Sequence, residues 1–218
     1  MDASTIASAL TAGGTLILAV ATFASTRSAN RASRAAERSL LANLRPVLVN
    51  AQIGDPVQKV GFADDHWVRL EGQQAAFDVP REDDDAPAIH LAFSVRNVGS
   101  GIAIIQGWCP TPQRLMGADG HAPVEHFRAQ TRSLYIPPGG VGFWQGALRD
   151  PDDPVFSEFA KAAATRDPVT IDLLYSDMNG GQQTITRMSM TSLSEDPESG
   201  RPLWWAAIGK HWLLSEEA

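Results

Sequence analysis

Cysteine and recognisable catalytic motifs are almost absent from this sequence of 218 residues. Its single cysteine, Cys109, has no internal disulfide partner, and one unpaired thiol suits a reducing compartment. The segment Gly99-Ser100-Gly101 lacks the spacing of a Gly-x-Ser-x-Gly nucleophile motif. No Walker loop or dinucleotide fingerprint can be assembled around Gly209-Lys210. These absences argue against nucleotide hydrolysis and leave no residue to name as catalytic.

Charge is also absent from residues 3–26. At about 1.5 Å per helical residue, the run from Ile6 to Ala24 is long enough to cross a hydrocarbon core of roughly 30 Å. A secretory signal peptide would begin with basic residues, whereas the only early charge here is Asp2. The pattern therefore predicts a transmembrane helix over residues 1–26.

Arginines follow the uncharged run at once. At about 100° per residue, positions 27, 31, 34, 38 and 45 fall within a sector of roughly 60° on one face of a continuous helix. Positive flanks stay on the cytoplasmic side, so the N-terminus is expected outside and the rest of the chain inside, as a single-pass protein of the inner (plasma) membrane. A basic juxtamembrane helix is expected over residues 27–45. Its topology anchors are Arg27, Arg31, Arg34 and Arg38.

The opposite side of this helix carries small residues and leucines at near-heptad spacing. Such a seam could pack against a second copy of the chain or against the following domain, with Ala9 and Gly13 as a small-xxx-small pair in the membrane. The simpler interpretation is a juxtamembrane stalk whose arginines bind lipid headgroups. The seam residues are Ala29, Ser33, Ala36, Leu40 and Leu44.

The rest of the chain is acidic. Five Arg and one Glu give residues 27–45 a charge of +4 and Asp2 contributes −1, so a total of −7 leaves −10 for residues 46–218. An acidic domain with dispersed Lys and Arg is repelled by phosphodiester backbones. Nucleic-acid binding is therefore not expected.

Residues 46–218 are expected to form one β-rich domain. Pro46 lacks an amide donor and disfavours a helical conformation of the residue before it, so the helix should stop there. Beyond it, short alternating segments are separated by Gly, Pro and Asp clusters. This pattern is typical of an immunoglobulin-like antiparallel β-sandwich.

The clearest strand is His90–Asn97, whose alternate side chains divide into an inward and an outward set. The inward set is Leu91, Phe93 and Val95. Further strands are expected at 46–53, 67–70, 102–108, 132–136, 141–145, 169–175 and 184–190.

One short interior helix is expected, because Asp153 can cap it and Pro154 suits its first position. The tryptophan-rich segment 203–214 is ambiguous, since it fits a closing strand, a core helix or an interfacial helix.

Metal ligands are sparse. His121, Glu125 and His126 follow Cys109 with a spacing that zinc can use, but the first cysteine pair of a zinc finger is missing. We therefore expect an exposed polar loop here, and no cofactor or metal.

Two acidic groups, at 83–85 and at 150–153, lack the glycine and terminal glutamate of an EF-hand. Solvated loops are expected at both. Asp177 is followed by Asn179 and Gly180, which favours a turn over a role as acid or base.

Four short motifs lie at the predicted strand ends and turns: Arg45-Pro46, Asn97-x-Gly99-x-Gly101-x-Ala103, Ile136-Pro137-Pro138-Gly139 and Tyr175-x-Asp177-x-x-Gly180. Together they resemble a loose class of uncharacterised bacterial proteins with one membrane helix and a cytoplasmic immunoglobulin-like sandwich. Those proteins often have Gly-Pro-Ala where this chain has Gly101-Ile102-Ala103. The Asn-Gly and Pro-Gly spacings are also similar to adhesion-type immunoglobulin-like modules. The resemblance implies a fold and brings no catalytic residue.

An anchor, a spacer and an acidic sandwich without catalytic residues predict a non-catalytic interaction module tethered to the bilayer, a scaffold or sensor subunit that binds a protein partner. Structural homo-oligomerisation through the juxtamembrane helix is one alternative. An enzyme or ligand-binding domain with a site built from loops is another.

Overall fold

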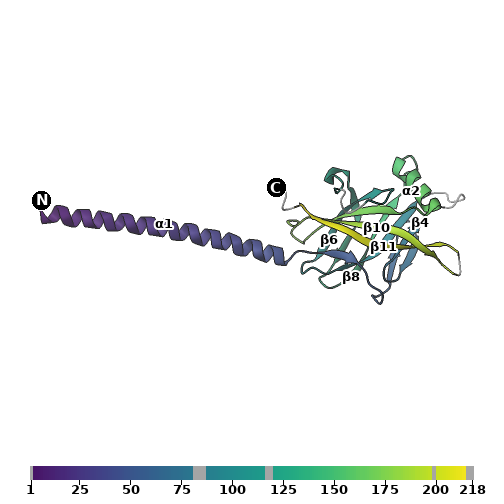
Figure 1. Cartoon of the computed structure of the whole chain (residues 1–218), viewed down its shortest axis with the longest axis horizontal. Helices are drawn as coiled ribbons and strands as arrows, with labels where there is room; N and C mark the ends of the chain where they lie inside the picture. The colour runs from purple at the N-terminus through teal and green to yellow at the C-terminus, as the bar shows by residue number, and fades with distance from the viewer. Residues whose placement is uncertain (1, 81–86, 116–119, 198–199, 215–218) are drawn as a thin grey trace. The chain divides into compact units, whose positions relative to one another are not determined.

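The computed structural model divides the chain into two units, residues 1–43 and 44–218 (Figure 1). It describes residues 2–80, 87–115, 120–197 and 200–214, without the side chains of 3–12, 38 and 41–43. The first unit is helical and the second is mainly β.

The first unit is one continuous helix, α1 (Ala3–Asn43). Large apolar side chains such as Leu16 and Phe23 are exposed along it. Across the residues that the structure describes, however, no helix combines the length and the apolar character needed to cross a membrane. The predicted transmembrane helix is therefore not supported. The run on which it was based begins at Ile6, within residues whose side chains lie outside the description.

The predicted juxtamembrane helix, 27–45, ends two residues early at Asn43. Leu44 and Arg45 belong to the β unit, where the Arg45 carbonyl oxygen accepts a hydrogen bond from the Ser100 amide at 3.2 Å. The Arg45 side chain donates to Gln182 Oε1 at 2.9 Å. These contacts and the restriction imposed by Pro46 end the helix. Leu44 therefore lies outside α1 and is not part of the predicted seam.

The described residues of the second unit form eleven strands, a 3-10 turn η1 (Val124–His126) and a helix α2 (Pro154–Thr165). The strands are β1 (Leu48–Asn50), β2 (Gln58–Gly61), β3 (Trp67–Leu70), β4 (Gln74–Asp78), β5 (Ile89–Asn97), β6 (Ala103–Thr111), β7 (Arg128–Ile136), β8 (Val141–Leu148), β9 (Val169–Ser176), β10 (Thr184–Glu195) and β11 (Pro202–Leu213).

The strand pairing is antiparallel throughout the described residues, which confirms the mainly β, antiparallel prediction. Nine strands form a single sheet in the order β1-β5-β4-β11-β10-β9-β6-β7, with β8 on the other edge of β5. β2 and β3 form a separate hairpin. The sequence did not predict that so many strands would be joined in one hydrogen-bonded path.

Both faces of β5 are buried. Leu91, Phe93 and Val95 point into the main core as predicted. The opposite face was expected to be outward, but Ala92 packs under the β2–β3 hairpin in a second cluster with Val60, Phe62 and Leu70. The β2–β3 hairpin, of which only the strand at 67–70 was predicted, thus covers β5, and His90 and Ser94 are buried beside Ala92.

The predicted interior helix is confirmed as α2. Asp153 accepts a hydrogen bond from the Val155 amide at 2.9 Å and Pro154 occupies the first turn, as expected for an N-terminal cap. The ambiguous final segment is a strand, β11, which pairs with β10 and β4 and buries Trp204. Figure 1 shows β10 and β11 running side by side as the longest strands of the domain.

The turn motifs have structural roles. Asn97 is fully buried, and its side chain bonds four backbone groups, the amides of Val47 and Gly99 and the carbonyl oxygens of Gly101 and Ile136. This residue ties together three chain segments, including the entry into β1.

Candidate functional site

A groove of about 630 Å³ lies between β7 and β8. These strands are neighbours along the chain and in space. In the described sheet, nevertheless, β7 pairs only with β6, and β8 only with β5. Side chains bridge the gap instead, because the Gln130 amide donates to the Gln145 carbonyl oxygen at 3.1 Å. Residues 61–63, after β2, line the same groove.

Three arginines line this groove, and no acidic residue does so within the described chain. Arg128 and Arg132 come from β7, and Arg149 follows β8 directly. Asp153 pairs with Arg128, and Asp64 pairs with Arg149 at 3.0 Å. The groove thus gathers cations in an otherwise acidic domain, and we call it the arginine groove.

Arg132 differs from the other two because it has no carboxylate partner in the described structure. One terminal nitrogen donates to the Gly61 carbonyl oxygen at 2.9 Å and to Gln145 Oε1 at 3.1 Å. The guanidinium also lies over the Phe143 ring, 5.7 Å from its centroid. Its Nε and other terminal nitrogen make no hydrogen bond to any described residue. Paired N–H groups of this kind bind a carboxylate or phosphate well, so Arg132 is held ready for an oxyanion.

Aromatic rings support the groove from below. Trp108 is buried, the Arg128 guanidinium lies 5.7 Å from the centroid of its ring, and the ring contacts Trp144 edge-on at 5.3 Å between centroids. A Cβ at Gly146 would lie 2.6 Å from Trp144 and 3.0 Å from Trp108. Glycine at this position therefore allows the two rings to pack tightly.

Two histidines contact Phe62, one of the residues that line the groove. The rings of His66 and His90 are stacked, with centroids 4.1 Å apart and planes inclined by 12°. His90 Nε2 contacts Asp64 Oδ2 at 2.8 Å, and His66 Nε2 contacts Asp78 Oδ2 at 3.0 Å. Phe62, a groove residue, packs edge-on against His90 at 4.6 Å between centroids.

Burial and neighbouring charges set the protonation of this pair. Burial lowers the pKa of His90, and the nearby His66 and Arg149 lower it further, although the hydrogen bond to Asp64 acts in the opposite direction. Partial burial alone would raise the pKa of Asp64, but its hydrogen bond with His90, the charge of His90 and that of Arg149 lower it to about 2. Near neutral pH, Asp64 is therefore charged and His90 favours its neutral form.

The histidine pair also borders a second cavity, of about 690 Å³. Its walls include the Phe77 and Trp204 rings and residues 163–164 at the end of α2. The Trp204 indole N–H is buried without a hydrogen-bond partner in the described structure. This is the cavity that the ligand-binding alternative would need, and that alternative stays a prediction.

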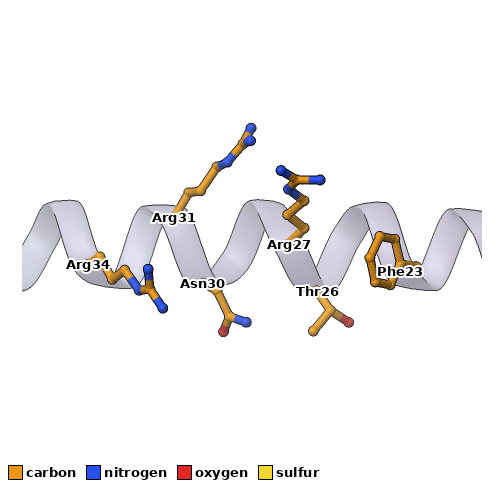
Figure 2. Close-up of a pocket in the computed structure, with 6 residues that line it drawn as sticks. All are labelled: Phe23, Thr26, Arg27, Asn30, Arg31 and Arg34. Carbon is orange, nitrogen blue, oxygen red and sulfur yellow. The ribbon is translucent and has the colours of Figure 1, made fainter.

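The predicted topology anchors lie on α1, apart from any enclosed site. Figure 2 shows Arg27 and Arg31 projecting from the same side of the helix, with Arg34 on the following turn. All three are exposed, while the side chain of Arg38 lies outside the description. With Phe23 they border a shallow depression along one helix.

The predicted seam keeps four members on α1. Ala29, Ser33 and Ala36 are exposed, and Leu40 is 66% exposed. Self-association through this seam stays a prediction.

The possible metal ligands do not come together. Among the described residues, no group of three or more His, Cys, Asp or Glu side chains has the geometry to hold a metal ion. His121 instead contacts the Trp212 ring edge-on, and Glu125 and His126 lie on the exposed η1 turn.

The acidic groups have structural partners where they are described. Asp153 caps α2, and the Asp150 side chain accepts a hydrogen bond from the Asp152 amide at 3.0 Å. Asp177 accepts from the Gly181 amide at 2.9 Å, as expected of a turn residue. The group at 83–85 lies outside the described residues.

Sequence reasoning missed one buried ion pair. Arg187 on β10 donates two hydrogen bonds, both 2.8 Å long, to the carboxylate of Asp172 on β9. The same guanidinium reaches the Gly120 carbonyl oxygen and lies over the Trp212 ring at 4.8 Å. The only available signal was one charged residue in each of two strand segments that carry no other charge where they pair.

Comparisons with known proteins do not assign a family. No family model matches the sequence, and no curated protein matches it. One similar solved structure is a crystal structure of a protein from Archaeoglobus fulgidus, with 13% identity, coverage of 64% of this chain and 94% of that one, and a TM-score of 0.26. Another is an X-ray structure of a Northeast Structural Genomics Consortium target, with 14% identity, coverage of 65% and 83%, and a TM-score of 0.23. Likenesses this weak carry no argument about function.

Proposed function

We propose that this protein is a non-catalytic interaction module, tethered to a membrane by its N-terminal helix, and that it binds an acidic segment of a partner protein in the arginine groove. The observation that carries the proposal is Arg132. Its guanidinium is fixed by neutral oxygens and an aromatic ring and keeps unused donors at the groove.

Charge complementarity selects the occupant. Three arginines and no acidic residue line the groove in the described chain, and Arg132 is the one without a carboxylate partner there, so the groove attracts a carboxylate at Arg132. The surrounding domain has a net charge of −10, which opposes the approach of a long polyanion such as nucleic acid. A short acidic peptide segment can use the groove without crossing the acidic surface. Its anchor contact is a paired Arg132–carboxylate interaction, whose charge-assisted hydrogen bonds are roughly twice as strong as neutral ones.

Sequence supports the tether. Residues 3–26 carry no charge, and arginines at 27, 31 and 34 follow. Cationic side chains that follow an uncharged run bind anionic headgroups of the cytoplasmic leaflet. The proposal therefore places the acidic domain at the inner face of the plasma membrane.

Binding to the groove is tested with fluorescein-labelled peptides and the full-length protein in detergent. A peptide rich in Glu and Asp should bind, and an isosteric peptide of Gln and Asn should not. Arg132→Gln should weaken binding about tenfold, the effect of losing one charged hydrogen-bonded contact.

The matched control is Arg69→Gln, which removes the same charge from the exposed Arg69–Glu71 pair on β3. Its affinity for the acidic peptide should equal that of the wild type. Equal binding of the acidic and neutral peptides, or equal losses in the two variants, would overturn the proposal. Binding of anionic lipid vesicles but not of the peptide would assign the groove to headgroups instead.

Orientation is tested by thiol labelling in cells. Burial and the nearby Asp172 raise the pKa of the Cys109 thiol, which makes it a poor reporter. Tyr135, which is 71% exposed, is a better position, so the test uses Tyr135→Cys with Cys109→Ser. An impermeant maleimide should label this variant only after the cells are opened. Labelling in intact cells, or recovery of the protein without membranes, would contradict the tether.

A further inference from the structure

A line of contacts joins the histidine pair to the arginine groove. Asp64 Oδ2 contacts His90 Nε2 at 2.8 Å and also accepts a hydrogen bond from Arg149 at 3.0 Å. Arg149 and Phe62 line the groove, and Phe62 packs on His90. The His66 ring is stacked on the His90 ring. A change of charge on the histidines therefore alters the electrostatic potential at the groove.

We propose that the His66–His90 pair makes the groove pH-sensitive, so that its affinity for acidic segments rises when the pair takes up a proton. This inference rests on the proposed function, because it concerns the regulation of the same groove.

Protonation of the pair has two effects, and both raise the affinity of the groove for carboxylates. A proton on the pair adds a positive charge close to the groove, which attracts carboxylates. A cationic His90 also binds the shared Asp64 carboxylate more strongly, which leaves Arg149 less neutralised and more available to a ligand. Acidification therefore tightens binding on both counts.

The stacking limits the response to about one proton. Two imidazolium rings with centroids 4.1 Å apart would repel each other, so the second proton is taken up at lower pH than the first. Because burial lowers the pKa of His90 from the ordinary value of 6.5, the change falls on the acid side of that value.

Other charged groups also face the pair. Asp78, from β4, contacts His66 Nε2 at 3.0 Å. Arg149, just after β8, lowers the pKa of His90, and Arg201, just before β11, borders the same cavity. The shared Asp64 favours protonation of His90. Each ring thus has its own carboxylate.

The experiment measures the dissociation constant of the Glu/Asp peptide for the full-length protein at pH 7.5 and 5.5, where the peptide carboxylates stay largely ionised. We expect binding to tighten about threefold at pH 5.5, the effect of one added charge near a partly screened site. His90→Gln should keep the pH 7.5 affinity and lose most of the tightening.

His121→Gln is the matched control, because His121 contacts Trp212 and lines neither the groove nor the second cavity. It should tighten as the wild type does. Asp64→Asn gives a second test that does not depend on histidine, since it removes the anion that neutralises Arg149. This variant should bind the peptide more tightly than the wild type already at pH 7.5.

The outcomes separate the two proposals. Absence of peptide binding at both pH values would overturn the proposed function. Binding that is equal at pH 7.5 and 5.5, or tightening that persists in His90→Gln, would overturn only the pH dependence. Circular dichroism at both pH values confirms that each variant is folded.

Discussion

Two Asp–Arg pairs in the same domain have opposite environments. The side chains of Asp172 and Arg187 are 2% and 1% exposed, whereas those of Asp64 and Arg149 are 35% and 49% exposed. The first pair joins opposite positions of β9 and β10 and is buried, and we call it the sealed pair. The second pair includes Arg149, which lines the arginine groove, and we call it the open pair.

The difference shows how burial divides structure from response. A sealed pair cannot exchange partners without leaving a charge in a low-dielectric interior, so it holds two strands in register. An open pair loses little when a ligand, a proton or water replaces one partner. The following predictions test this contrast in order of decreasing effect.

Breaking the sealed pair should have the largest effect. Arg187→Met leaves the Asp172 carboxylate buried without its cation, so we expect the free energy of unfolding to fall by about 3–5 kcal/mol. Urea unfolding followed by tryptophan fluorescence measures the change. Adding Asp172→Leu to this variant should restore part of the loss, and no restoration would show that the pair is not the cause.

Removing a buried hydroxyl should have the next largest effect. The Tyr175 hydroxyl accepts from the Leu48 amide at 3.1 Å and bonds Thr186 at 2.9 Å. Tyr175→Phe leaves a buried amide without its partner, which should cost about 1–3 kcal/mol in urea unfolding. Tyr135→Phe is the control, because Tyr135 is 71% exposed and its loss should be neutral.

Acidification should produce a smaller loss of stability. Burial lowers the pKa of both His90 and His211 below the ordinary 6.5, so the unfolded chain takes up protons first as the pH falls. The free energy of unfolding should therefore be fully retained above that value and decline below it. Urea midpoints at pH 7.5, 6.5 and 5.5 measure the slope. It should become shallower in His90→Gln, and an unchanged slope would argue against this residue.

Breaking the open pair should have the smallest effect. Arg149→Met makes the same change as Arg187→Met at an exposed site, and we expect less than about 1 kcal/mol. If the two variants were equally destabilised, the contrast between sealed and open pairs would be wrong.

The sequence predicted those features that are encoded locally. The cap at Asp153, the turn at Asp177 and the alternation of Leu91, Phe93 and Val95 are properties of adjacent residues, and all three are confirmed. The helix end was displaced, because Arg45 is held by Gln182, which lies far along the chain.

The candidate site was not predicted, because it also depends on contacts between residues that are far apart in the sequence. The groove brings Gly61, Arg132 and Gln145 together from three strands, and no sequence spacing signals their contact. The stacking of His66 on His90 likewise depends on a hairpin that covers the outer face of β5. Only an isolated charge in an otherwise uncharged strand segment, as at Arg187, could have pointed to a polar partner.

The way in which the chain enters the β unit has a mechanical consequence. A Cβ at Gly99 would overlap the Arg45 carbonyl oxygen, and one at Gly101 would overlap that of Leu44, so both glycines let the backbone strands touch. The Asn97 side chain makes its four hydrogen bonds at this junction. A pulling force applied to the chain from its N-terminal side would have to break the Asn97 hydrogen bonds before it could separate β1 from β5, so this junction should resist mechanical unfolding of the domain.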